Sequence, residues 1–225
     1  MLDLLLETEL TGEQREYAED SRLCAHSLLD IMNSTLEYSA LSANEVTLEE
    51  DELAFVELLD SLLDEYSAKA SAKGLTLIRN LPANIPEGIV ADGVKLKKLF
   101  SNLLENAVKF TTAGEIEVSC SAVYTQTSLL FTFSVRDTGI GIAEDKLASI
   151  FESFRQLEMG LGRRFTGIGL GLAVSEKLAR LMNAEITVQT EVNRGSTFSV
   201  ILPLQLSRVS SGTCDLSGEW AQTPS

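Results

Sequence analysis

The sequence predicts an α+β chain in which a helical N-terminal part precedes a domain that mixes strands and helices. Two observations predict this class. Through residues 13–41 and 54–73, apolar residues recur every three or four positions, which is the spacing of one helix face. After residue 74, such stretches are separated by short stretches in which apolar and polar residues alternate, as in half-buried strands. With 225 residues, 44% of them hydrophobic, the chain is long enough for one full domain and a smaller element.

Charge and cysteine content exclude several classes of function. The formal net charge is -15 at pH 7, which argues against nucleic-acid binding because that function needs basic surface. Cys24, Cys120 and Cys214 are far apart and have no metal-type spacing. We therefore expect a reducing compartment, with neither a disulfide framework nor a zinc site. Because no apolar run reaches the roughly 18 residues of a membrane span, we expect a cytoplasmic segment without membrane contact.

Residues 13–41 are predicted to form a long helix that needs a partner helix. Thr11 and Gln14 have the spacing of a capping box at its start. A nearly heptad path of apolar residues favours packing on a second helix of this chain or of another copy; it comprises Tyr17, Cys24, Leu28, Ile31 and Tyr38. His26 is the only histidine. Since Asp30 is the only carboxylate one turn away, we interpret His26 as a partly exposed helix residue rather than a phosphoacceptor or general base.

A second helix is predicted over residues 54–73, ending at Gly74. The acidic run Glu49–Glu52 is interpreted as a solvated helix start whose charge complements the helix dipole. Leu75–Arg79 is predicted to be a short strand, followed by a turn at Pro86–Gly88.

The next helix, from near Val94 to Thr111, carries two different stripes. Its apolar stripe comprises Leu96, Leu99, Phe100, Leu103 and Ala107. Its polar stripe comprises Lys98, Asn102, Asn106 and Lys109. Amide oxygens can ligate Mg2+ and ammonium groups can meet phosphate, so this stripe suits a metal-bound anion. By itself it fits a solvated helix face at least as well.

Two strands are predicted after this helix, over residues 116–122 and 131–135. The second strand ends at Asp137, which is followed by Gly139 and Gly141. A buried carboxylate at a strand end can accept a hydrogen bond from an exocyclic amine, and glycines let the backbone approach closely. Taken alone, Asp-Thr-Gly is also a common turn.

A short helix is predicted over Glu144–Phe151, and a glycine-rich run, Gly167–Gly171, opens a helix over Leu172–Met182. Glycine-rich turns at a helix N-terminus offer free N–H groups to phosphate, and Arg163 and Arg164 could reach the same phosphates. The run matches neither the dinucleotide-binding fingerprint nor the Walker loop.

The chain is expected to end in a β-hairpin and a tail. Alternating apolar residues over 186–202 flank the turn Asn193–Gly195. From Ser207 the chain is rich in Ser, Gly and Thr, which is typical of a flexible tail.

Four motifs stand in a fixed order: Asn102–Thr111, Asp137–Ile142, Phe151–Phe154 and Gly167–Leu172. Together they resemble the N, G1, F and G2 boxes of the ATP-binding domain of sensor histidine kinases, in the GHKL fold shared with gyrase, chaperone and mismatch-repair ATPases. Gly195–Phe198 is similar to the final strand motif of that family. The resemblance implies a partial dimerisation and histidine-phosphotransfer stem, a helical hairpin, over 1–44, an ATP-binding catalytic domain over 45–206 and a flexible tail over 207–225.

The implied fold is a Bergerat-type two-layer α/β sandwich, a mixed sheet packed under helices, with ATP between the helices and a lid. The resemblance implies that Asn106 ligates Mg2+ and that Asn102 and Lys109 support the phosphates. It implies that Asp137 accepts from the adenine amino group. Further ATP-binding residues implied by the pocket floor, the lid and the last strand are Gly139, Gly141, Phe151, Phe154, Arg163, Arg164, Gly167, Gly169, Gly171 and Thr197.

The sequence departs from the family pattern around the lid and in the stem. Thr166 stands where the family usually has glycine, and Ile168 replaces a common threonine. The family's phosphoacceptor histidine would lie before Met1, so we expect no catalytic residue in this chain and no autophosphorylation. By the same resemblance, Asn102 occupies the position at which the ATP hydrolases of the wider fold have a glutamate. Since an amide cannot act as a general base, we expect slow hydrolysis.

The resemblance implies the catalytic portion of a two-component sensor histidine kinase, which transfers the γ-phosphate of ATP to a histidine for relay to a response-regulator receiver domain. The alternative is a non-catalytic nucleotide-binding or regulator-docking module, which Thr166 and Ile168 favour. ATP or ADP with Mg2+ is the implied ligand, and a homodimer through the stem is implied for the family. The segment would be cytoplasmic, either alone or as the cytoplasmic part of a longer sensor.

Overall fold

The computed structural model describes residues 1–43, 45–124, 129–155 and 169–207. The chain divides into two compact units. The first unit contains residues 1–46 and 148–177, and the second contains residues 47–147 and the chain from residue 178 onward.

A long helix dominates the first unit. It is α2 (Gly12–Ser42), and the short helix α1 (Leu2–Leu6) packs against it. The predicted capping box is confirmed: the Thr11 hydroxyl accepts from the Gln14 N–H, and the Gln14 side chain accepts from the Thr11 N–H. Only Ala18 and Leu41 of α2 are buried. Its large apolar side chains are exposed, namely Tyr17, Leu23, Leu28, Leu29, Ile31, Met32 and Leu36.

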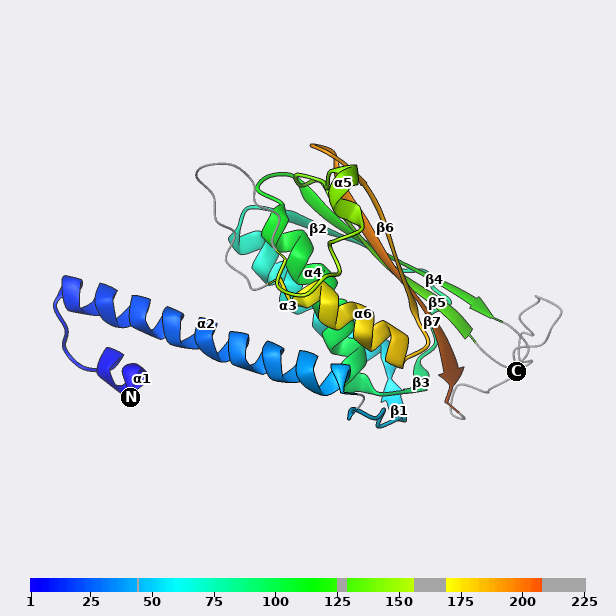
Figure 1. The fold of residues 1–225 in the computed structure, drawn as a ribbon, viewed down its shortest axis with the longest axis horizontal. Helices are drawn as coiled ribbons and strands as arrows, with labels where there is room; N and C mark the ends of the chain where they lie inside the picture. The colour runs from blue at the N-terminus through cyan, green and yellow to red at the C-terminus, as the bar shows by residue number, and fades with distance from the viewer. Residues whose placement is uncertain (44, 125–128, 156–168, 208–225) are drawn as a thin grey trace, which may run out of the picture. The chain divides into compact units, whose positions relative to one another are not determined.

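The second unit is built on a mixed sheet, as predicted. The described strands are β1 (Asp51–Ala54), β2 (Thr76–Asn80), β3 (Gly88–Ala91), β4 (Glu115–Tyr124), β5 (Leu129–Asp137), β6 (Glu185–Glu191) and β7 (Gly195–Leu206). Their order is β1-β3-β7-β5-β4-β2, and β6 pairs with β7. The β2–β4 pair is parallel and the others are antiparallel. The long strand β7 (Figure 1) therefore has β5 along one edge and both β6 and β3 as further partners.

The structure corrects two of the predicted elements. Glu49–Glu52 was expected to start a helix, but Asp51–Ala54 pairs with Gly88–Ala91 as an edge strand. Three of the four residues of β1 are exposed, so no apolar alternation marked the strand, and its partner is distant in sequence. The helix expected over Glu144–Phe151 is also shorter, because α5 ends at Leu147.

Helices α3 (Phe55–Ala72) and α4 (Gly93–Phe110) cover one face of this sheet (Figure 1). Aromatic side chains from both layers meet in the core. Phe55 lies edge-on to Phe131 with ring centroids 4.8 Å apart, and Phe100 stacks on Phe133 at 4.1 Å. All four are fully buried, and burial of such side chains stabilises a fold by about 1.5–3 kcal/mol each.

The N-terminus of α4 is anchored by one buried carboxylate. Asp92 is the N-cap, and its carboxylate accepts from the backbone N–H groups of Lys95 and Glu49, both at 3.0 Å. The Lys95 ammonium also pairs with it. Burial raises the pKa of the Asp92 carboxyl, but these donors outweigh burial and hold it below its usual range. The residues before β1 are thus tied to the helix that carries the polar stripe.

Helix α6 (Gly171–Leu181) begins in the first unit and ends in the second. Beyond β7, Ser207 is buried and donates its N–H to Gly88 O, so the sheet contacts reach the first residue of the expected tail. Residues 208–225 lie outside the described residues. Among the described residues, no helix has the length and apolar character needed to cross a bilayer.

Candidate functional site

Asp137 lies on the buried face of the sheet because of the alternation of β5. Leu129, Phe131, Phe133 and Val135 point into the core, and Asp137 is the next residue in that series. Only 6% of Asp137 is exposed. Burial raises the pKa of its carboxyl, while N–H donors from Gly139, at 2.8 Å, and Ser196 oppose that rise, and the pKa stays above its usual range. This carboxylate is an acceptor held at a strand end, as the sequence predicted.

The loop after Asp137 is pressed between the end of α4 and the β6–β7 hairpin. A Cβ on Gly139 would lie 2.5 Å from the Phe110 carbonyl oxygen. A Cβ on Gly141 would lie 2.0 Å from the Glu191 carbonyl oxygen, and Gly141 has a φ of +66°. Side chains are therefore excluded at both glycines. The structure brings Gly139, Gly141 and Asp137 together with the C-terminal end of α4.

Thr138 anchors the same loop from its other side. Its hydroxyl accepts from the Glu115 N–H at 3.0 Å and donates to the Glu115 carbonyl oxygen at 3.2 Å. The segment between α4 and β4 is thereby joined to the end of β5. No sequence signal singled out this hydroxyl, because its partner is a backbone group 23 residues away.

The polar stripe of α4 is partly covered rather than fully solvated. Its four members, Lys98, Asn102, Asn106 and Lys109, are half-buried, whereas Glu105 between them is exposed. In the described part of the chain, two buried side-chain polar atoms lack a hydrogen-bond partner, Asn106 Nδ2 and Thr111 Oγ1. Buried polar atoms are nearly always paired in folded proteins. Two such atoms at one helix end point to a polar ligand.

Two lysine ammonium groups, those of Lys73 and Lys109, lie at the same end of α4. Burial lowers the pKa of the Lys109 ammonium. The charge of Glu105 raises this pKa and the charge of Lys73 lowers it, and the net result is a pKa below the usual range. Lys73 Nζ donates to the Val108 carbonyl oxygen at 3.0 Å. A negatively charged group placed here would favour the charged form of Lys109.

The predicted lid anchors belong to the first unit. Phe151 is half-buried, and Phe154 is exposed with a φ of 63° and lies edge-on to Tyr38 at 6.4 Å. Gly169 has a φ of +74°, and a Cβ there would lie 2.4 Å from the Arg155 carbonyl oxygen. Residues 155 and 169, on either side of the segment predicted to form the lid, are thus in direct contact. Gly171 starts α6, while Arg163, Arg164, Thr166, Gly167 and Ile168 lie outside the described residues.

Ser196, and not the predicted Thr197, shares the face of Asp137. In the β5–β7 register Asp137 pairs with Ser196, and Arg136 pairs with Thr197. Opposite residues point to the same face and neighbours point to opposite faces. Ser196 is also buried and donates its N–H to Asp137. Ser196 lies two residues before the apolar residue Phe198, so the alternation of the strand places both side chains on one face. This spacing was the signal in the sequence that could have identified Ser196.

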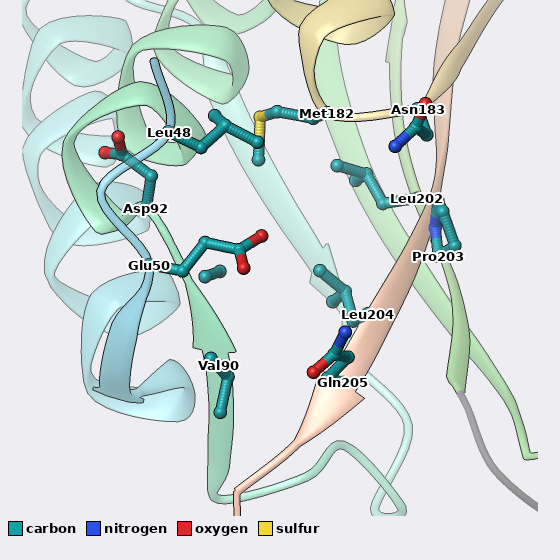
Figure 2. A pocket seen from close by; sticks show the side chains of 11 residues that line it. Leu48, Glu50, Val90, Asp92, Met182, Asn183, Leu202, Pro203, Leu204 and Gln205 are labelled. Carbon is teal, nitrogen blue, oxygen red and sulfur yellow. The ribbon is translucent and has the colours of Figure 1, made fainter.

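A cavity of about 280 Å³ lies elsewhere in the second unit (Figure 2). Glu50 points into it in Figure 2, and its other lining residues are Leu48, Val90, Ala91, Asp92, Met182, Asn183, Leu202, Pro203, Leu204 and Gln205. Leu204, which lines the cavity, lies eight residues beyond Ser196 on β7, which corresponds to roughly 27 Å along the strand. None of the predicted ATP-binding residues lines this cavity.

Comparison with known proteins identifies the family to which this chain belongs. Residues 91–206 match the family described as "Histidine kinase-, DNA gyrase B-, and HSP90-like ATPase". The chain belongs to this ATPase family. It is similar to the signal transduction histidine-protein kinase BarA of Escherichia coli K12, with 34% identity over 204 residues, which is 90% of this chain and 22% of BarA. The chain is also 35% identical to the aerobic respiration control sensor protein ArcB of the same strain over 200 residues, which is 88% of this chain and 25% of ArcB.

A solved structure supports the fold of this ATPase-family chain. Full-length ShkA, crystallised in complex with AMPPNP, is 32% identical with a TM-score of 0.77, covering 92% of this chain and 42% of ShkA. The α+β fold with a mixed sheet and an ATP-binding domain of the histidine-kinase type is therefore confirmed. The chain spans a quarter or less of the length of BarA and ArcB.

Proposed function

We propose that this chain is the ATP-binding catalytic portion of a sensor histidine kinase, which delivers the γ-phosphate of ATP to a histidine for relay to a response-regulator receiver domain. Two neighbouring features carry this proposal. Asp137 is a buried hydrogen-bond acceptor, and at the C-terminal end of α4 the buried atoms Asn106 Nδ2 and Thr111 Oγ1 have no hydrogen-bond partner. The contact between Gly139 and Phe110 places the two features next to each other.

The residues of the second unit fit both ends of ATP. Asp137 is an acceptor for an exocyclic amine, such as that of adenine. Lys109 suits phosphate, and the Asn106 amide has an oxygen for Mg2+ and an N–H for a phosphate oxygen. When bound, ATP would supply the phosphoryl group for transfer. Asn102 lies one turn before Asn106 and cannot act as a general base, which favours transfer over hydrolysis.

Replacing Asn106 with Ala is expected to weaken Mg2+-dependent ADP binding by about tenfold, because one metal ligand and one phosphate donor are removed. Titration calorimetry with and without Mg2+ measures this effect. Glu105→Gln is the matched control, since Glu105 is adjacent but exposed, and it should bind ADP like the wild type. Equal ADP affinity in Asn106→Ala and the wild type would refute the role of Asn106.

Transfer itself is tested by mixing the chain with γ-labelled ATP and a separate histidine-bearing stem protein. Acid-labile label on the stem is the expected result. Nucleotide binding without any transfer would instead identify a non-catalytic module. Multiple-turnover release of free phosphate would contradict the assignment of Asn102.

We also propose that α2 pairs with a second copy of the chain. Its exposed apolar side chains include Leu28, Leu29, Met32 and Leu36, each more than half exposed. Such a surface is stabilised by packing on another helix. Leu36→Glu is expected to shift the chain toward monomer at equal concentration in analytical ultracentrifugation. Leu130→Glu, an exposed leucine on β5, is the control, and a monomeric wild type would contradict the proposal.

A further inference from the structure

The edge of β7 that carries β6 and β3 has a gap between these two strands. Along β7 the pairing with β6 ends at Ile201, and the pairing with β3 begins at Gln205. Among the described strands, residues 202–204 are therefore paired with β5 alone. These residues line the cavity of about 280 Å³, so the cavity lies at the gap. All of its lining residues belong to the second unit.

One backbone acceptor faces this gap. Ser207 donates its N–H to Gly88 O at the start of β3, and the backbone groups of alternate residues in a strand point to the same edge. The C=O of Pro203 is therefore directed toward this edge, where the β3–β7 register, continued by two residues, would place Asp92. Asp92 caps α4 instead. Since proline has no N–H, its backbone presents an acceptor and no donor to the gap.

A carboxylate adds to this acceptor character. Glu50 is exposed, and its side chain points into the cavity (Figure 2). In the part of the chain that the structure describes, Glu50 belongs to no ion pair. The carboxylate of Asp92 also lines the cavity, but it is paired with Lys95 and accepts from the Glu49 N–H. Glu50 thus supplies the uncompensated negative charge of the cavity.

The size and the walls of the cavity suit an organic ligand. Four large apolar side chains line it, those of Leu48, Met182, Leu202 and Leu204. Its volume is many times the share of one water in the liquid, about 30 Å³, and is close to the lower limit of small-molecule sites, about 300 Å³. Among the described residues, no group of three or more His, Cys, Asp or Glu could hold a metal ion. The acceptors therefore favour an organic cation.

We propose that this cavity binds a small primary amine with a short alkyl chain. The ammonium group has three N–H donors and no acceptor, which matches the Glu50 carboxylate and the Pro203 carbonyl oxygen. The alkyl chain packs against Leu48 and Met182, and its removal from water stabilises the complex. None of the predicted ATP-binding residues lines the cavity, so this site is separate from the proposed nucleotide site.

Calorimetric titration of the full chain with n-hexylamine at pH 7, where an alkylamine is protonated, tests the proposal. Hexylammonium is expected to bind at least about tenfold more tightly than hexanoate, whose charge is opposite. It should also bind about tenfold more tightly than butylammonium, because each buried methylene lowers the Kd by about fourfold. Absence of hexylammonium binding, or equal affinity for hexylammonium and hexanoate, overturns the proposal.

Glu50→Gln keeps the size of the side chain and removes its charge. This variant is expected to bind hexylammonium about three- to fivefold more weakly, as for the loss of a partly exposed ion pair. Glu49→Gln is the matched control, because Glu49 is adjacent and exposed and does not line the cavity; its Kd should equal that of the wild type. An unchanged Kd in Glu50→Gln, or equal weakening in both variants, overturns the proposal.

Leu48→Ala tests the apolar wall separately. The gain in affinity from butylammonium to hexylammonium should be smaller in this variant than in the wild type, and an unchanged gain overturns the placement of the alkyl chain in the cavity. Saturating ADP should leave the Kd of hexylammonium unchanged. Competition between the two ligands would place the amine in the nucleotide site and overturn the proposal.

Discussion

Replacing Asp137 with Asn is expected to weaken ADP binding by about 10- to 150-fold. This range corresponds to the loss of one charge-assisted hydrogen bond, about 1.5–3 kcal/mol. An asparagine amide also directs a donor toward the N–H groups of Gly139 and Ser196, which now hold the carboxylate. Calorimetric titration measures the change. Asp145→Asn is the control because Asp145 is exposed on α5, and it should not alter the affinity.

The same substitution is expected to remove part of the pH dependence of stability in the ligand-free protein. Because the folded-state pKa of Asp137 is raised, its contribution to stability is fully present below the unfolded-state pKa, near 4, and is lost as pH rises through the folded-state pKa. The asparagine side chain of the variant carries no such charge. Urea unfolding at several pH values should show the wild type losing stability relative to the variant as pH rises, and a difference that does not change with pH would contradict this assignment.

ADP affinity should depend on pH in the direction opposite to stability, and should increase as pH rises. The wild type accepts from the ligand with an ionised carboxylate, so ADP affinity is expected to fall as pH decreases through the raised pKa of Asp137. That loss should begin at a higher pH than an ordinary aspartate would give. Affinity that stays constant down to the usual aspartate range would contradict the buried environment of this group.

Gly195→Ala is expected to lower the free energy of unfolding by about 3–5 kcal/mol. Gly195 has a φ of +102°, and a Cβ there would lie 1.9 Å from the Asp137 carbonyl oxygen. The atoms that it would meet belong to the backbone, so no side-chain rotation can relieve the clash. Since β7 would have to move away from Asp137, nucleotide binding should be lost as well. Urea unfolding and ADP titration measure the two effects.

Gly93→Ala is the matched control for this substitution. Gly93 is in the same compact unit, at the start of α4, and it has no positive φ. A Cβ there would meet the Leu53 side chain at 3.1 Å, and a side-chain end can move aside. The expected change is within about 1 kcal/mol. A Gly195→Ala variant as stable as Gly93→Ala would contradict the close approach of β7 to Asp137.

Elements with a strong apolar period could be predicted from the sequence. The long helix 13–41 appears as α2, and the helix from near Val94 appears as α4. The alternating strands appear as β4, β5, β6 and β7. Strands β1 and β3 were missed because each has four residues and pairs with a distant segment. Their pairing depends on contacts across the fold and leaves little periodic signal.

Part of the candidate site was also readable from the chain. Asp137 follows an alternating apolar strand, so its burial could be inferred, and the glycines after it indicated close backbone approach. Ser196 was not identified. Small hydroxyl residues are frequent in strands, and the position of Ser196 beside Asp137 is set only when β5 and β7 lie in register.

The sequence by itself determined the longer helices and strands, the ATPase family and the identity of the buried acceptor, because period and motif are local properties of the chain. Only the tertiary structure decided which hydroxyl lies beside Asp137 and which polar atoms of α4 are left without a partner. Strand register sets the first, since a shift of one residue reverses every side chain to the other face. Helix-to-sheet packing sets the second, because burial removes the water that would otherwise satisfy Asn106 and Thr111.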